Sequence, residues 1–138
     1  MTYLLDKSAW VLAASNRGVA ARLAAEMRGG DLTLCTVTAL EVLYSARNAA
    51  EYTRDLDRLR RLDWRDLSDA RAAVAVQHRR ATRGWHRTSI PDVIIAATAA
   101  EHGLTVLHHD SDYERLAEVA GISHEWVAVR GSGHPSTT

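Results

Sequence analysis

The sequence predicts an α/β fold with a mainly parallel sheet, and three observations lead to this fold class. Short runs rich in leucine and valine alternate along the whole chain with longer segments of helical spacing. The length of 138 residues fits one domain with one hydrophobic core. One helical segment, 93–100, is apolar on all sides, so we expect it to be buried.

The first half of the chain opens on a strand that is followed by two helices. Residues 3–5 are apolar and end at Asp6, and Ser8 can cap the helix that comes next. A second helical pattern, 19–27, stops at the glycine pair 29–30, as helices commonly do. The chain therefore begins with a strand, an acid and a helix in direct succession.

The middle of the chain repeats this order. The apolar run 32–35 predicts a compact strand, and the residues after it turn into a helix that reaches Tyr44. From 51 to 62 charged residues alternate with leucines at helical spacing, which is typical of a solvated amphipathic helix. Residues 62–67 are expected to form a short strand at an edge of the sheet.

The last part of the chain contains two helices that flank a turn, and then another strand–helix–strand series. Ser68 is expected to cap a helix over 69–84, and Pro91 fits the first turn of the buried apolar helix. Three further elements complete the pattern: a strand over 104–107, a helix over 113–119 and a strand over 126–129.

The composition narrows the class of protein. Seventeen basic and seventeen acidic residues cancel, so the net charge gives no argument for binding nucleic acid. Every cation except Lys7 is an arginine; arginine suits phosphate, but a GC-rich genome gives the same bias and is the favoured cause. The lone Cys35 allows no disulfide within the chain, and we find neither a signal peptide nor a membrane span. We expect a soluble cytoplasmic protein with a folded domain over 1–130 and a loose tail over 131–138.

Four acids are expected to meet at one edge of the sheet. Asp6 ends the first strand, and Glu41 is expected in the first turn of the helix after the second strand. Asp92 opens the apolar helix, and Asp110 follows a later strand. Strand C-termini and helix N-termini share one edge of a parallel sheet, and ligands bind there.

These acids have a structural explanation and a chemical one. Glu41 could form a capping box with Thr38, and Asp92 could form a capping pair with Ser89, but caps do not account for the other two acids. Crowded carboxylates repel one another unless they take up protons or share a cation. Mg²⁺ or Mn²⁺ prefers oxygen ligands, and it can orient a water and neutralise phosphate charge. The pattern therefore predicts metal-dependent hydrolysis of a phosphodiester.

Other chemistries find less support in the sequence. The chain has no G-x-S-x-G, P-loop or G-x-G-x-x-G motif. Several histidines lack the closed spacing of a zinc site: His102, His108, His109 and His124. Two rivals stay open. One is a non-catalytic module that binds a partner protein and whose acids only cap helices. The other is a receiver-like domain that accepts a phosphoryl group, although such a domain requires a lysine after a central strand and the only lysine is Lys7.

A basic segment, 78–87, contains four arginines, two histidines and a tryptophan but no acid. The arginines are candidates for contacts with phosphate groups: Arg79, Arg80, Arg83 and Arg87. Cations are also common near helix C-termini without any function, so this segment alone indicates little.

Four stretches of the chain, taken in order, resemble the successive motifs of PIN-domain ribonucleases, and more closely those of the VapC toxins of VapBC toxin–antitoxin modules. These stretches are LLDKSAW at 4–10, TALEVL at 38–43, IPDVIIAA at 90–97 and LHHDSDYE at 107–114. The resemblance extends from about residue 3 to residue 129. It departs at Lys7, where the first motif usually has threonine, and we expect Lys7 to point away or to touch phosphate.

The resemblance implies a three-layer α/β/α PIN-like domain with a sheet of about five strands, and a toxin that acts as a Mg²⁺-dependent endoribonuclease, with Mn²⁺ as a possible substitute. It implies that Asp6, Asp92 and Asp110 hold the metal. Glu41 would complete the catalytic acids and help place the attacking water, and Asp112 would be an auxiliary acid. The four arginines become candidates for RNA binding. The resemblance also implies a homodimer and a VapB-type antitoxin whose C-terminal segment enters the acidic groove.

Overall fold

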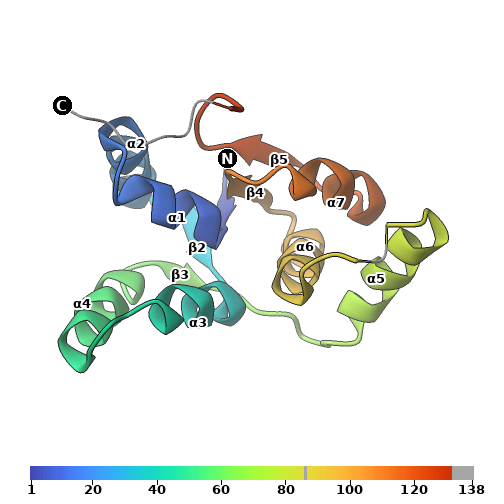
Figure 1. Ribbon diagram of the computed structural model, residues 1–138, viewed down its shortest axis with the longest axis horizontal. Coiled ribbons are helices and arrows are strands. Elements are labelled where there is room, and N and C mark those ends of the chain that lie inside the picture. Colours follow the sequence, from blue (N-terminus) through green and yellow to red (C-terminus); the bar gives the residue numbers. More distant parts are fainter. Residues whose placement is uncertain (86, 132–138) are drawn as a thin grey trace.

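Five parallel strands form one sheet in this computed structural model, which describes residues 1–85 and 87–131 (Figure 1). The strands are β1 (Tyr3–Leu5), β2 (Leu32–Leu34), β3 (Asp63–Trp64), β4 (Thr105–His108) and β5 (His124–Trp126). The helices are α1 (Lys7–Ala13), α2 (Arg17–Arg28), α3 (Thr36–Tyr44), α4 (Ala49–Leu59), α5 (Ala72–Thr82), α6 (Ile90–His102) and α7 (Asp112–Ala120). The predicted α/β class with a five-stranded parallel sheet is confirmed.

The first strand of the chain lies at the centre of the sheet. The strand order is β3-β2-β1-β4-β5, so the chain builds outward on one side of β1 and later returns to build on the other side. Tyr3 is in register with Leu32 on one neighbour and with Thr105 on the other. The strand order therefore reverses at β1, and ligands of such sheets bind beyond the carboxyl ends of the strands at this point.

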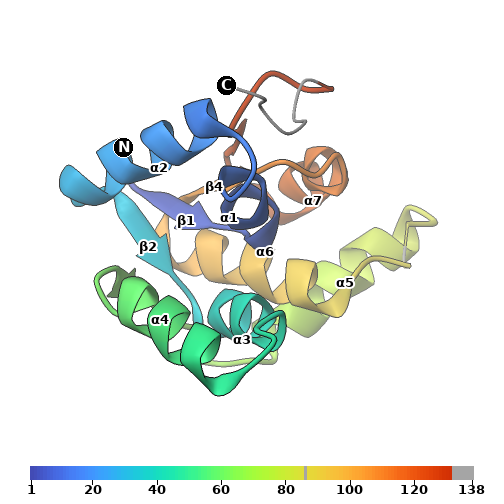
Figure 2. The same ribbon diagram turned by 60° about the vertical axis from the view of Figure 1, so that its left-hand side comes forward.

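Helices cover both faces of the sheet. Leu5 belongs to the core that the sheet forms with α1 to α4, whereas Leu4, the next residue along the same strand, belongs to the core formed with α5 to α7. The two sets of helices lie on opposite sides of the strands in Figure 1, and Figure 2 shows α5 projecting from the edge of the molecule. Both leucines are fully buried, which stabilises the fold by about 1.5–3 kcal/mol for each side chain.

Most expected elements shift by a few residues at their ends, and two of these differences have a clear physical cause. The last strand is His124–Trp126 rather than 126–129, because its partner β4 ends at His108, and the N–H of Val127 donates the final hydrogen bond to that residue. The expected helix cap at Ser68 is also wrong. Its hydroxyl donates to the carboxylate of Glu101 on α6 at 2.7 Å, and α5 begins four residues later.

The C-terminal tail expected over 131–138 lies outside the described residues beyond Gly131, so the domain boundary at residue 130 stays a prediction. Within 1–85 and 87–131, no helix combines the length and the apolar character that crossing a bilayer requires.

Candidate active site

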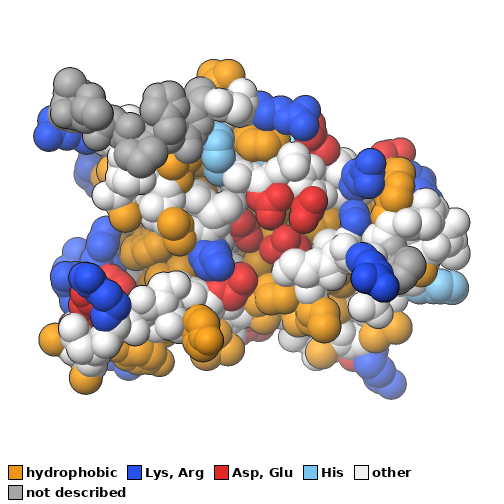
Figure 3. All heavy atoms as spheres, in the orientation of Figure 1, with side chains coloured by type: hydrophobic (Ala, Val, Ile, Leu, Met, Phe, Trp, Pro, Cys, Tyr) orange, Lys and Arg blue, Asp and Glu red, His pale blue; other side chains and the backbone are white. Residues whose placement is uncertain are grey.

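A cavity of about 210 Å³ opens at the carboxyl ends of the central strands. Asp6 directly follows β1, Asp110 lies two residues beyond β4, and Asp92 is the third residue of α6. We call this space the acidic cavity, and its lining residues are Asp6, Lys7, Ser8, Glu41, Ser89, Asp92, Asp110 and Asp112. All five acids singled out from the sequence thus face one space, and Lys7 faces it too. Figure 3 shows the acidic side chains gathered near the middle of one face of the molecule.

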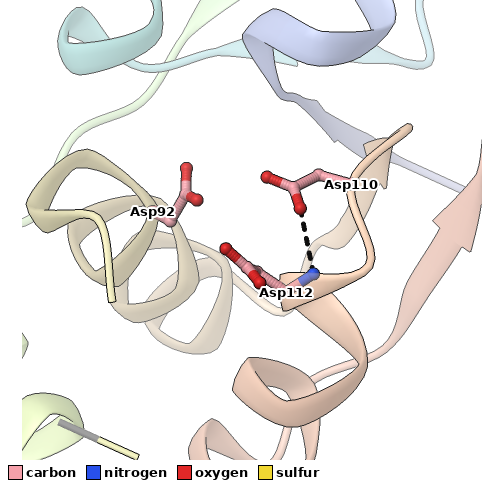
Figure 4. Close-up of side chains that lie close together, drawn as sticks. All are labelled: Asp92, Asp110 and Asp112. Atoms are coloured by element: carbon pink, nitrogen blue, oxygen red, sulfur yellow. Dashed lines mark hydrogen bonds between the residues drawn. The ribbon is translucent and has the colours of Figure 1, made fainter. Parts of the chain in front are cut away.

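Three of these carboxylates form a tight cluster. Asp92, Asp110 and Asp112 each offer one oxygen, and these three oxygens lie within 4.8 Å of one another. Figure 4 shows the three side chains converging from α6, from the loop after β4 and from the start of α7. The N–H of Asp112 donates to the Oδ1 atom of Asp110 at 3.0 Å, which fixes the relative position of these two residues. Among the described residues, this is the one cluster that presents three metal-ligating groups at such distances.

Asp6 is tied to the cluster through a tyrosine that the sequence analysis did not single out. The hydroxyl of Tyr113 lies 2.7 Å from Oδ1 of Asp6 and 3.2 Å from Oδ1 of Asp92, so its single hydrogen can satisfy one carboxylate at a time. The other oxygen of Asp6 accepts from the N–H and the hydroxyl of Ser8. Ser89 makes no capping hydrogen bond with its side chain, so the alternative of a Ser89–Asp92 capping pair is wrong.

Glu41 does not form a capping box either. Helix α3 begins at Thr36, which puts Glu41 in its second turn rather than in the first. The hydroxyl of Thr38 donates instead to the carbonyl oxygen of Leu5 at 3.1 Å. The Oε1 atom of Glu41 is buried without a hydrogen-bond partner among the described residues. Helix capping therefore does not explain why this acid faces the cavity.

Burial, and then the crowding of acids, raises the pKa of two of them. Burial, followed by the charge of Asp6, raises the pKa of Asp92 to about 7. Burial and Asp6 also raise the pKa of Glu41, whereas Lys7 opposes this shift. A cation would relieve both shifts because it favours the charged form of each acid. The donor set consists of carboxylate oxygens and includes an unpartnered buried oxygen, which fits Mg²⁺ or Mn²⁺.

A neutral histidine holds the loop that carries Asp110. The N–H of Asp110 donates to Nδ1 of His108 at 3.1 Å, so the hydrogen of His108 sits on Nε2, which faces Nδ1 of His124 at 2.9 Å. Burial, together with the neighbouring His124 and His109, lowers the pKa of His108 to about 3. Both ring nitrogens are therefore engaged in hydrogen bonds, which leaves no lone pair on His108 for zinc.

The four predicted RNA-binding arginines lie in different environments. Arg79 is exposed on α5, and Arg83 forms an ion pair with Glu118 at 2.8 Å. Arg80 is only 5% exposed, and its Nη1 atom has no hydrogen-bond partner among the described residues. Arg87 lines a second, larger cavity next to the acidic one. The four arginines of the basic segment therefore do not all face one cavity, and their role in RNA binding stays a prediction.

Comparison with known proteins identifies the family to which this chain belongs. A sequence profile of the PIN domain matches residues 3–119. The chain belongs to the PIN domain family. This PIN domain is similar to Ribonuclease VapC51 of Mycobacterium tuberculosis, with 36% identity over 135 residues that cover 96% of this chain and 97% of that protein. It is also similar to Ribonuclease VapC21 of the same organism, with 39% identity and coverage of 94% and 96%. The resemblance to VapC proteins expected from the four motifs is confirmed.

Solved structures of other proteins have the same fold. The PIN domain superposes on a chain of VapBC2 from Rickettsia felis bound to a promoter DNA fragment, with a TM-score of 0.74, 16% identity and coverage of 91% of this chain and 98% of that one. It also superposes on a chain of DNA-bound VapBC from Salmonella typhimurium, with a TM-score of 0.68, 22% identity and coverage of 93% and 99%. The three-layer PIN-like arrangement expected from the sequence is therefore confirmed.

Proposed function

We propose that this PIN domain protein is a metal-dependent endoribonuclease and the toxin component of a type II toxin–antitoxin system. The observation that carries the proposal is the convergence of Asp92, Asp110 and Asp112 at the strand ends of a PIN domain whose relatives are named VapC ribonucleases. The protein acts on RNA phosphodiester bonds, and it acts in the cytoplasm.

The ion that this site holds in the cell is Mg²⁺, for which Mn²⁺ can substitute. Asp92 and Asp110 would bind it, and Asp112, predicted as an auxiliary acid, offers a third oxygen at the same point. Asp6 stays a predicted ligand, and its hydrogen bonds to Tyr113 and Ser8 hold its carboxylate beside the cluster. When bound, the ion would neutralise charge on the phosphate and lower the pKa of a water molecule.

The residues of the chain supply the remaining requirements for hydrolysis. Glu41 has an unpartnered oxygen and a raised pKa, so it can accept a proton from a water placed against the phosphate. Lys7 faces the same cavity, and its cation can contact a phosphate oxygen. This placement favours the second of the two orientations that the sequence analysis expected for Lys7.

The protein forms a homodimer, and a VapB-type antitoxin neutralises it by inserting its C-terminal segment into the acidic cavity. Two features support partner binding. Large apolar side chains are exposed on α1 and α3, namely Val11, Leu40 and Tyr44. A solved structure with this fold, from Klebsiella pneumoniae, is described as a toxin–antitoxin complex.

The rival reading, a non-catalytic module that binds a partner, requires that the acids only cap helices. Ser89 makes no side-chain cap, and Glu41 lies in the second turn of α3. Asp6 does cap α1 through the N–H of Ser8, but its second oxygen accepts from Tyr113 instead. Asp110 likewise accepts from the N–H of Asp112, the first residue of α7. Capping bonds therefore account for one oxygen of Asp6 and one of Asp110, and they leave Glu41 and Asp92 unexplained.

Cleavage of total cellular RNA tests the proposed function. The purified chain is incubated with Mg²⁺, with EDTA, and as the Asp92→Asn variant, and Asp57→Asn on the exposed face of α4 serves as the matched control. We expect discrete fragments that require both metal and Asp92 and that persist in the control. Cleavage that survives EDTA, or that Asp92→Asn leaves intact, would contradict the proposal. If no RNA is cut and Mg²⁺ does not bind, the partner-binding module becomes the better reading.

A further inference from the structure

A second cavity of about 630 Å³ adjoins the acidic one. It lies between the end of α5, the chain that follows it and the first turns of α7. We call it the arginine cavity, and its lining residues are Arg80, Gly84, Trp85, Arg87, Ser111, Asp112, Glu114, Arg115 and Arg130. Asp112 lines both cavities, so the two spaces meet at this residue. Figure 3 shows basic side chains beside the acidic patch on the same face. The volume is within the range of small-molecule binding sites.

The lining has an excess of positive charge that the described residues do not neutralise. It contains four arginines but only two acids. Glu114 pairs with Arg130 at 3.2 Å, and Asp112 belongs to the carboxylate cluster. Arg87 and Arg115 form no ion pair with another described residue. The acidic side chains of the described residues therefore do not balance the positive charge of this cavity.

The buried side chain of Arg80 also has a hydrogen-bond donor without an acceptor among the described residues. Its side chain is fixed, because its Nε atom donates to the carbonyl oxygen of Trp85 at 2.8 Å. Its Nη1 atom is buried without a partner, and no ion pair joins it to Asp112, although that carboxylate acts on it through space. A buried cation with an unpaired donor costs free energy unless a ligand accepts from it.

Aromatic rings lie against two of the cavity arginines, Arg115 and Arg130, and Trp85 also contacts Arg83, which is outside the lining. The guanidinium carbon of Arg115 lies 4.9 Å from the ring centroid of Trp85, and that of Arg83 lies 5.5 Å from it. Arg130 stacks in the same way on Trp126, at 5.7 Å. The ring of Trp85 holds the guanidinium of Arg115, which forms no ion pair with another described residue. Its N–H groups therefore remain available, and this planar set of donors matches the oxygens of a phosphate group.

We propose that the arginine cavity binds a phosphate group of the RNA, one nucleotide away from the phosphate that the acidic cavity cleaves. This inference rests on the proposed ribonuclease function and assigns a position on the substrate to each cavity. Arg80, Arg87 and Arg115 contact the phosphate oxygens. Because Asp112 borders both cavities, the two phosphates belong to neighbouring nucleotides. The cavity thereby sets which bond of a bound strand lies over the acids.

Binding of a mononucleotide tests the cavity without any cleavage. Isothermal titration in EDTA compares adenosine 5′-monophosphate with adenosine, for the wild type and for Arg115→Gln. The matched control is Arg61→Gln, an exposed arginine outside the cavity. We expect the nucleotide to bind, adenosine not to bind, and Arg115→Gln to weaken nucleotide binding at least about tenfold. Equal binding of the two compounds, or an equal loss in Arg61→Gln, would overturn the proposal.

The variant Arg80→Lys adds a second measurement, because it keeps the positive charge but removes the planar guanidinium group with its several N–H donors. We expect it to weaken nucleotide binding while circular dichroism shows a folded protein; unchanged binding would contradict the role of Arg80. An acidic peptide, tetra-aspartate, is titrated as the competing ligand. If it binds more tightly than the nucleotide, the cavity belongs to an acidic protein partner and the proposal falls.

RNA cleavage separates this proposal from the proposed function. With Mg²⁺ present, we expect Arg115→Gln to raise KM for RNA about tenfold relative to the wild type, to leave kcat nearly unchanged, and to reduce the salt slope of RNA binding by about 1. Nucleotide binding without metal-dependent cleavage would refute the ribonuclease alone. Metal-dependent cleavage without nucleotide binding would refute the phosphate position alone.

Discussion

The acidic cavity and the arginine cavity share Asp112 but carry opposite charge. In the first, carboxylates crowd within 4.8 Å of one another in a space of about 210 Å³. In the second, four arginines are spread over a space of about 630 Å³, and Arg115 lies over the ring of Trp85. The close spacing suits a small cation, and the wide spacing suits a larger anion. The same kind of unbalanced charge thus indicates two different ligands, and geometry distinguishes them.

Loss of a carboxylate should have the largest effect on activity. We expect Asp110→Asn to lower kcat at least about 100-fold, because it removes a charged oxygen from the cluster while the amide oxygen can still accept from the N–H of Asp112. Initial rates on a cleaved RNA measure the effect. Asp63→Asn, on the exposed edge strand, is the control and should retain wild-type rates. A change in KM alone would assign Asp110 to substrate binding and would blur the distinction between the cavities.

Metal binding should stabilise the fold through the acidic cavity only. A ligand at 100 times its Kd stabilises a folded protein by about 2.7 kcal/mol, so saturating Mg²⁺ should raise the melting temperature by several degrees. We expect this rise in the wild type and in Arg115→Gln, and its absence in Asp110→Asn. Differential scanning calorimetry measures it. An equal rise in all three proteins would show that Mg²⁺ acts elsewhere.

The metal-free protein should lose stability as the pH rises. The pKa of Asp92 is raised to about 7 from its ordinary 3.8, so the folded state binds this proton more tightly than the unfolded state does. The stabilisation by this proton is complete below pH 3.8 and is lost as the pH rises to 7. In EDTA, we therefore expect Asp92→Asn to melt a few degrees above the wild type at pH 8 and at the same temperature near pH 4. The same difference in melting temperature at both pH values would show that the pKa of Asp92 is not raised in the folded protein.

The smallest effect should come from the tyrosine hydroxyl between the acids. Tyr113→Phe removes the hydrogen bonds to Asp6 and Asp92 and should cost about 1 kcal/mol of folding free energy in EDTA. Activity should fall up to about tenfold, because both carboxylates lose an orienting partner. Tyr52→Phe on the exposed face of α4 is the matched control for chemical denaturation and cleavage. If Tyr113→Phe behaves like this control, the hydroxyl does not position the acids.

Sequence patterns were sufficient for the parts of the acidic cavity that follow strand ends. Asp6 and Asp110 could be placed because an apolar run ends just before each acid, and the parallel sheet brings such ends to one edge. Glu41 was expected at the same edge, but its position in α3 was wrong by about one turn. A Thr-x-x-Glu pattern cannot show that the hydroxyl of Thr38 donates to the carbonyl oxygen of Leu5 in β1.

Sequence reasoning missed the role of the Tyr113 hydroxyl and the burial of Arg80, because both depend on contacts between distant segments. Tyr113 follows Asp112 in a helical pattern, and an aromatic residue at such a position is expected in the core, so its hydroxyl gave no signal. Arg80 lies near a helix C-terminus, where arginines are usually solvated, and its burial depends on Trp85 and on the packing of α5 against α7. Tertiary packing alone decides which arginine of the basic segment faces the site.

The central position of β1 also affects how the protein folds during its synthesis. Tyr3 pairs with Thr105, so the middle of the sheet joins two segments that synthesis separates by about a hundred residues. Contacts of such long sequence separation form late, because the intervening chain must first be brought together. A growing chain that lacks β4 and α7 contains Asp6, Glu41 and Asp92 but cannot hold them against Asp110 and Asp112. The acidic cavity therefore stays incomplete in a nascent chain until the segment that contains Asp110 and Asp112 has been synthesised.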